Sequence, residues 1–166
     1  MIPKKKQRTL WWSAVVLYIA LIYSTLGVAP QWWELFDAAL GGRGMAAQHF
    51  LYIGIAVAIF LYLVYIKREN SLAKYFWFFV CVGVAWAIIK ATPRAAEKIH
   101  LAEYGLLGVL CYHALKIDLD RLRWKLYVGG ALLCLAIGAI DEVIQLMLPN
   151  RYFDWRDLFV NGASGA

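Results

Sequence analysis

The chain has 166 residues, of which 63% are hydrophobic and only 17% are charged, and its mean hydropathy is +0.60. A soluble domain is typically about 45–50% apolar and about 25% charged, so this composition excludes a soluble globule, and it also excludes a disordered chain, which is poor in apolar residues. The net charge of +6 would favour a nucleic-acid partner in a soluble protein. In a chain this apolar it reflects membrane topology instead, and we expect no nucleic acid.

Five apolar runs are long enough to cross a bilayer, which requires about 20 residues. They cover residues 10–29, 45–66, 75–89, 99–115 and 126–148. The third run is short, but the flanking Lys74 and Lys90 can extend it by snorkelling. A further helix is expected to begin near Asp154. The sequence therefore predicts an all-α polytopic transmembrane helix bundle with five crossings plus the start of a sixth helix.

The first run follows a basic segment, as a signal peptide would. It is about 20 residues long, whereas the apolar core of a signal peptide has about 7–15, and no clear cleavage site of small residues follows it. We therefore expect a retained membrane anchor.

The basic residues of the loops predict the orientation, because cytoplasmic loops carry an excess of Lys and Arg. A cytoplasmic N-terminus places eleven of the seventeen basic residues inside: Lys4, Lys5, Lys6, Arg8, Lys67, Arg68, Lys74, Lys116, Arg121, Arg123 and Lys125. The others lie outside: Arg43, Lys90, Arg94, Lys98, Arg151 and Arg156. The sequence therefore predicts that the N-terminus is cytoplasmic.

Polar side chains gather at the predicted outer ends of the fourth and fifth runs. At 3.6 residues per turn, two helix faces run from polar residues outside to small residues inside. They are formed by Glu97, His100, Tyr104, Gly108 and Cys111, and by Cys134, Gly138, Asp141 and Gln145. Small residues let helix backbones approach closely in lipid, so we expect the two helices to pack along these faces below a polar mouth.

Ionisable residues inside a membrane are costly and usually mark a site. Neighbouring carboxylates such as Asp141 and Glu142 can share a proton or bind a cation, and a desolvated acid can serve as a general acid or base. His100 can do the same nearer neutral pH. The alternative is a structural ion pair with a nearby Lys or Arg. The predicted catalytic residues are His100, Glu103, Asp141 and Glu142, and whether a metal binds stays open.

The segment after the fifth run continues the polar pattern. Asp154 is expected to cap the next helix, with Asp157 in its first turn. Asn161 shares their face, and a purely structural cap does not require it. The predicted binding residues are Glu97, Tyr104, Gln145, Arg151, Asp154, Asp157 and Asn161.

Three other features have simpler explanations. His49 and His100 lie near the outer ends of their helices and could ligate a haem or a pigment, but no C-x-x-C-H motif supports this minor alternative, and no cofactor is assigned. Three cysteines without metal-type spacing indicate neither a disulfide framework nor a zinc site. Ser164 lies in G-A-S-G-A rather than a G-x-S-x-G elbow, so we expect it to serve helix packing.

The C-terminal part combines three motifs in a specific order and spacing. They are His100 with Tyr104; Asp141 and Glu142 with Gln145; and Pro149 and Arg151 followed by Asp154, Asp157 and Asn161. Together they resemble the VanZ-like family, named for a teicoplanin-resistance protein, over about residues 94–166. Many members have Asp-Lys where this chain has Ala96 and Glu97, and the final glycine is displaced by one place to Gly165. We therefore predict an N-terminal three-helix membrane region in 1–90 and a VanZ-like membrane domain in 91–166.

The resemblance implies a small multi-pass protein of the bacterial inner (plasma) membrane, linked to glycopeptide tolerance and thus to antibiotic resistance. It implies no reaction, and whether the protein is an enzyme stays open. Combined with the outer polar site, it suggests binding of, or action on, a lipid-linked cell-envelope molecule, with Arg151 and Arg156 holding phosphate or sugar groups. The alternative is a non-catalytic interaction subunit of a larger membrane complex. The expected partners are membrane lipid, a lipid-linked envelope precursor or other membrane subunits.

Overall fold

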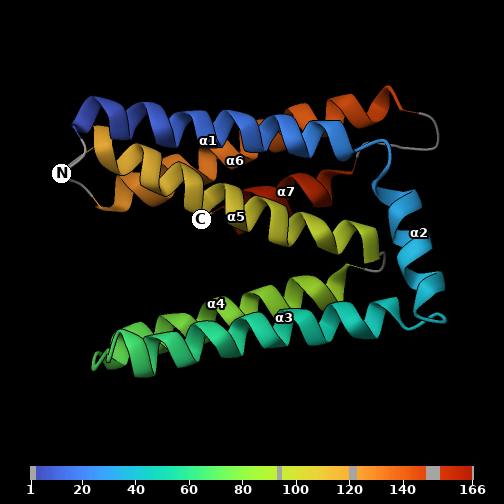
Figure 1. Cartoon of the computed structure of the whole chain (residues 1–166), viewed down its shortest axis with the longest axis horizontal. Helices are drawn as coiled ribbons and strands as arrows, with labels where there is room; N and C mark the ends of the chain where they lie inside the picture. Colours follow the sequence, from blue (N-terminus) through green and yellow to red (C-terminus); the bar gives the residue numbers. More distant parts are fainter. Residues whose placement is uncertain (1–2, 93–94, 120–122, 149–153, 166) are drawn as a thin grey trace. The chain divides into compact units, whose positions relative to one another are not determined.

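The computed structural model describes residues 3–92, 95–119, 123–148 and 154–165. In chain order they form α1 (Lys4–Thr25), α2 (Ala29–Ala39), α3 (Gly44–Leu61), the π-helix η1 (Tyr62–Ile66), α4 (Leu72–Ala91), α5 (Ala95–Asp118), α6 (Arg123–Leu146) and α7 (Trp155–Ser164) (Figure 1). No strand occurs among these described residues. The predicted all-α fold class is confirmed.

Several helices have the length and composition of membrane spans. Within the described residues, Gly44–Ile66, Leu72–Ala91 and Trp124–Leu146 qualify, and α1 with α2 would add a fourth if the two form one broken span. The helix α5 has 24 residues, enough for a crossing at 1.5 Å per residue, but its first half carries Lys98, His100 and Glu103. Five crossings therefore stay a prediction, whereas a membrane protein with at least three candidate spans is shown.

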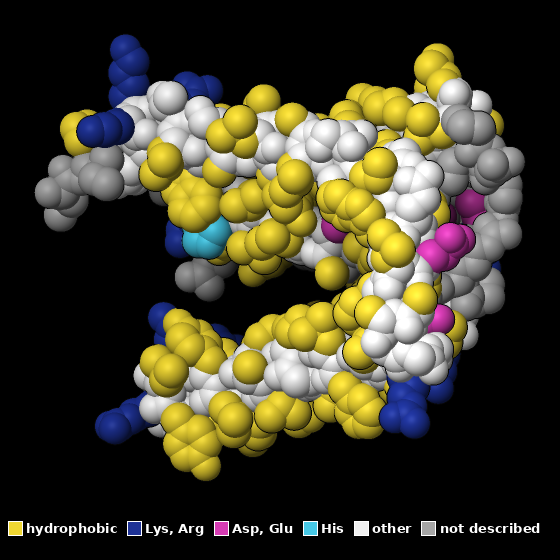
Figure 2. Space-filling view, turned by 45° about the vertical axis from the view of Figure 1, so that its right-hand side comes forward, with side chains coloured by type: hydrophobic (Ala, Val, Ile, Leu, Met, Phe, Trp, Pro, Cys, Tyr) yellow, Lys and Arg dark blue, Asp and Glu magenta, His cyan; other side chains and the backbone are white. Residues whose placement is uncertain are grey.

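The distribution of side chains fits a lipid environment. On the face shown in Figure 2, hydrophobic side chains cover the lengths of the helices, and Lys and Arg side chains gather near helix ends. Large apolar residues such as Leu17, Phe50 and Phe76 are exposed. A soluble protein rarely exposes apolar surface on this scale, so these faces are suited to acyl chains.

The predicted apolar runs locate most helices, but two differences appear near the N-terminus. The predicted run covers residues 10–29, whereas the first helix begins at Lys4 and ends at Thr25. The helix begins early because Lys and Arg are good helix formers, although these residues do not enter the hydrocarbon region. The apolar runs do not predict the short helix α2, because its eleven residues include Glu34 and Asp37 and form no apolar run of spanning length. A prediction of crossings thus misses a helix that is too short to cross.

The chain divides into two compact units: residues 1–29 with 96–166 form unit 1, and residues 30–95 form unit 2. The core of unit 1 consists of residues from α1, α5 and α6, namely Val15, Ile22, Tyr104, Leu107, Cys111, Ala114 and Cys134. The first helix therefore packs with the C-terminal helices that carry the polar motifs. The predicted boundary near residue 90 stays a prediction.

Polar contacts fix α1 to its neighbours near both of its ends. The Trp11 ring stacks on His113 with 4.5 Å between centroids, and the Trp12 indole donates a hydrogen bond of 3.1 Å to Asp118. Towards the other end, the Tyr23 hydroxyl donates to the Ile137 carbonyl at 2.9 Å. These bonds set the register of α1 against α5 and α6.

The helix α7 is a short element that packs along α6. Its ten residues span about 15 Å at 1.5 Å per residue, roughly half of a hydrocarbon core. It begins beside Glu142, which accepts from the Asp154 backbone N–H at 2.8 Å, and it ends at Gly165 against Cys134. The helix thus descends from the end of α6 to its middle.

In unit 2, the aromatic ring of Phe60 lies against Tyr75, Phe78 and Phe79 of α4. A groove of about 380 Å³ between α3 and α4 is lined almost entirely by apolar side chains, among them Ile53, Trp86 and Ile89. The contact between α3 and α4 is therefore apolar.

Candidate functional site

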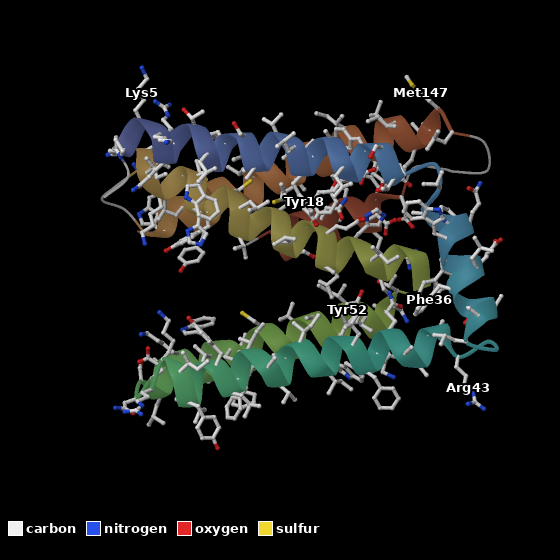
Figure 3. All side chains as sticks on the ribbon, viewed as in Figure 1. Lys5, Tyr18, Phe36, Arg43, Tyr52 and Met147 are labelled. Carbon is white, nitrogen blue, oxygen red and sulfur yellow. The ribbon has the colours of Figure 1, made fainter. Side chains whose placement is uncertain are left out.

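The polar motifs come together near one end of unit 1. Figure 3 labels Lys5 and Met147 at opposite ends of this unit, and Met147 directly follows the last residue of α6. Asp141 precedes that last residue, Leu146, by five residues, which is about 7.5 Å along a helix axis. The candidate site is therefore roughly one and a half turns below the end of α6.

Asp141 is the centre of the cluster and is fully buried, with 0% exposure. Its Oδ2 accepts a hydrogen bond of 2.9 Å from the Tyr104 hydroxyl of α5. Its Oδ1 accepts one of 3.1 Å from the Gln145 amide, one turn further along α6. Both carboxylate oxygens thus have donors, which makes the burial of this acid possible.

Glu142 is also fully buried and points toward the start of α7. Its Oε2 accepts the Asp154 backbone N–H at 2.8 Å, and its Oε1 lies 3.4 Å from the Gln145 amide. One glutamine side chain therefore connects two adjacent acids. This arrangement explains the D-E-x-x-Q spacing, since only residues three and four apart meet on a helix face.

His100 connects the buried acids with a more exposed one. Its Nδ1 lies 3.3 Å from Glu103, whose side chain is 24% exposed, and 3.9 Å from Asp141. His100 itself is buried, and no contact to Nδ1 has the geometry of a full hydrogen bond among the described residues. The imidazole is thus placed to exchange protons between an accessible carboxylate and the interior of the cluster.

The helix α7 contributes the third side of the polar cluster, after α5 and α6. Asp157 is buried and lies close enough to His100 and Glu142 to interact with both electrostatically. One turn further, Asn161 is fully buried, and neither atom of its amide has a hydrogen-bond partner among the described residues. A Cβ at Gly138 would lie 2.8 Å from the Asn161 amide nitrogen. Glycine at this position therefore makes room for the asparagine.

The first helix contributes tyrosines that the motifs did not predict. Tyr23 donates to the carbonyl of Ile137, one turn before Asp141, and it interacts electrostatically with that acid. Tyr18 interacts likewise with Glu103, and Figure 3 labels it on the inner side of α1. Two tyrosines five residues apart within an apolar run were the available signal in the sequence.

Some predicted residues are not part of the described cluster. Arg151 and the side chain of Glu97 lie outside the described residues, so their predicted roles are not described. Arg156 is exposed and pairs with Asp154 at 2.9 Å within the first turn of α7. His49 belongs to unit 2, where its ring lies 5.9 Å from Trp86, and its suggested haem or pigment ligation stays a prediction.

The arrangement is suited to hydrogen bonding and proton exchange. Among the residues that the structure describes, no three His, Cys, Asp or Glu side chains are grouped to hold a metal ion. A cavity of about 380 Å³ lies further along unit 1, lined by residues including Gly105, Gly108, Tyr112 and Gly165. The acids themselves are enclosed by their own partners, and Glu103 is the more exposed member of the cluster.

A family model described as VanZ/LLP1 matches residues 5–166. The match includes α1 to α4 and so extends well beyond residues 94–166, where the sequence motifs lie. No curated protein and no solved structure matches the chain.

Proposed function

The chain belongs to the VanZ/LLP1 family, and we propose that the cluster around Asp141 and Glu142 binds a lipid-linked molecule of the cell envelope and performs acid–base chemistry on it. The site would open to the outer leaflet of the bacterial inner membrane. In this proposal His100, Glu103, Asp141 and Glu142 handle protons, and the polar residues of α7 hold the headgroup.

The observation that carries the proposal is the complete burial of two adjacent acids within a membrane unit. An ionised side chain within a membrane helix is costly, although less so near the interface than at the helix centre, and two apolar residues would avoid that cost. A protein that only needed to pack α5 against α6 would not require Asp141 and Glu142. The presence of both is expected of a functional site.

The position of the cluster fits a headgroup attached to a lipid. The acids lie about 6–8 Å below the end of α6 by helix geometry, close to the level where lipid headgroups meet acyl chains. A membrane-anchored substrate therefore reaches the site by lateral diffusion. Its phosphate would pair with Arg156 at the start of α7, because carboxylates repel it, and its sugar portion would meet the carboxylate of Glu103. His100 then lies between that carboxylate and Asp141.

The test uses the full chain in nanodiscs with a defined probe. Binding of a polyprenyl phosphate and of a polyprenyl-phosphate-linked sugar is measured by native mass spectrometry, and products are sought by liquid chromatography. We expect Asp141→Asn to remain folded and to lose binding or conversion of the sugar-linked probe. The control is Leu132→Ala, on an exposed face of α6.

A cellular measurement addresses the role in glycopeptide tolerance. Cells that produce the wild-type chain should tolerate teicoplanin better than cells that produce Asp141→Asn at the same level. Equal tolerance at equal protein level would contradict this part of the proposal.

One observation favours the second candidate, a non-catalytic interaction subunit. Glu142 accepts the backbone N–H of Asp154 and thereby fastens α7 to α6, which is a structural role. If that role were the whole purpose of the cluster, Asp141→Asn and Glu142→Gln would fail to fold or to accumulate, and neither probe would bind the wild-type chain.

A further inference from the structure

We infer that α2 is an amphipathic helix that lies in the plane of the membrane, with its aromatic face inserted among zwitterionic lipids at the interface. The proposal is independent of the site in unit 1. It also means that α2 is not the second half of a broken span that begins with α1.

The sequence of α2 separates apolar from polar residues around the helix. At 100° per residue, Trp32, Leu35 and Phe36 share one side, with Ala39 between them. Glu34 and Asp37 lie on the opposite side. With eleven residues, α2 is about 16 Å long, too short to cross about 30 Å of hydrocarbon. A helix that has one apolar and one charged face, and that is too short to span, is suited to lie in the plane of the membrane interface.

The apolar side of α2 is open in the structure. Trp32 is 60% exposed, Leu35 is 70% exposed and Phe36 is 45% exposed. Large aromatic and aliphatic residues with this exposure require an apolar or interfacial environment. Trp in particular favours the level of lipid headgroups, because its ring is apolar and its N–H can still form hydrogen bonds.

The turn between α2 and α3 fixes the direction of α2 within unit 2. Gly41 and Gly42 adopt positive φ values of 61° and 79°, and the Gly42 N–H donates to the Asp37 carbonyl at 2.9 Å. The Asp37 carboxylate accepts the Gly44 N–H at 2.7 Å, at the start of α3. This locked turn ends α2 and sends the chain into α3, which runs crosswise to α2 (Figure 1).

The occupant of the apolar face follows from this geometry. The helix α3 with η1 is a candidate span. Because α2 runs crosswise to α3 and joins it at the end where that span begins, α2 lies along the membrane surface. At the start of α3, Met45 and Phe50 are exposed as well, so lipid meets the chain on both sides of the turn. The lipid that surrounds α3 therefore extends over the apolar face of α2.

The charge of α2 selects the kind of lipid. The helix contains Glu34 and Asp37 and no Lys or Arg. Basic residues are what draws an interfacial helix to anionic lipids. The two carboxylates are instead repelled by an anionic surface, so the insertion of α2 should not deepen when anionic lipid is added to a zwitterionic bilayer.

The test is spin-label accessibility in the full chain, reconstituted in vesicles of phosphatidylcholine. Cys81, which is exposed, is replaced by Ser, and the label background of the buried cysteines is measured in that parent. Single cysteines are introduced at Phe36 and Glu34, which lie about 160° apart around α2 at 100° per residue. Val57, on an exposed face of α3, gives the reference for acyl-chain depth, and Arg68, in the following loop, gives the reference for water.

We expect the label at Phe36 to favour oxygen over a water-soluble nickel reagent, as Val57 does, and the label at Glu34 to favour the nickel reagent, as Arg68 does. Labels that both behave like Val57 would show that α2 continues a span. Labels that both behave like Arg68, or that are inaccessible to both reagents, would show that lipid does not cover this face. Each of these three results overturns the proposal, and so does a deeper insertion on addition of phosphatidylglycerol. The pair Trp32 and Glu34 repeats the measurement if the Phe36 variant does not accumulate.

Discussion

A close approach between α6 and α7 makes Gly138 a sensitive position. A Cβ built on Gly138 lies 2.8 Å from both the Cβ and the amide nitrogen of Asn161. The amide can rotate, but the Asn161 Cβ is fixed to the backbone of α7. Gly138→Ala therefore forces α7 away from α6, or Asn161 out of its buried position.

Two opposing effects set the size of the change. Alanine in place of an interior helical glycine stabilises by about 0.5–1 kcal/mol, whereas forcing one carbon into a well-packed core costs about 1–3 kcal/mol. The control is Gly83→Ala in α4, where an added Cβ meets nothing within 4 Å and only the helix gain remains. The difference between the two variants is the packing cost, and we expect Gly138→Ala to be less stable than Gly83→Ala by about 1–3 kcal/mol.

The assay is denaturant unfolding in detergent micelles, combined with hydrogen exchange of the α7 backbone. Gly138→Ala should lower the free energy of unfolding and accelerate exchange in α7, while Gly83→Ala should do neither. Equal stability of the two variants, with unchanged exchange in α7, would refute the close packing of Asn161 on Gly138.

Three further predictions follow from single contacts. Tyr104→Phe removes a donor to a buried carboxylate and should lower the free energy of unfolding by about 1–3 kcal/mol, measured by denaturant unfolding, whereas Tyr65→Phe, at an exposed tyrosine, should have no effect. Asp154→Ala removes the side-chain cap of α7 and should cost about 0.5–2 kcal/mol; hydrogen exchange in α7 should accelerate, and Asp154→Asn, which keeps the cap, should restore it. The third prediction concerns orientation and uses single cysteines at Met147 and Lys5, which mark opposite ends of unit 1, in a parent without Cys81. If the N-terminus is cytoplasmic, the cysteine at Met147 should react with an impermeant maleimide on intact cells, and the cysteine at Lys5 only after permeabilisation. The reverse result would contradict a cytoplasmic N-terminus.

The apolar runs predicted the helices because lipid acts on composition directly. A segment that crosses hydrocarbon must satisfy its backbone internally, so a long apolar run predicts a helix without any knowledge of its neighbours. The same reasoning could not predict α2, whose helix is defined by two faces and by the turn at Gly41 and Gly42.

The spacing of the motifs also predicted which side chains share a helix face. His100 and Tyr104 lie on one face of α5, and Asp141 and Gln145 on one face of α6, because residues four apart are neighbours on any helix. Their assignment to a catalytic or binding role stays a prediction. The tertiary structure shows only how they are arranged.

What the sequence determined by itself was therefore local: an all-α membrane chain, the helices of spanning length, and the polar faces that α5, α6 and α7 would carry. Only the tertiary structure decided that Tyr23 of α1 supports the turn before Asp141, that Glu142 fastens the start of α7, and that Gly138 makes room for Asn161. Helix periodicity fixes the direction of a side chain around its own axis, but not the partner that it meets. That partner depends on how closely two helices approach, and the approach is set by small residues at contacts far apart in the chain.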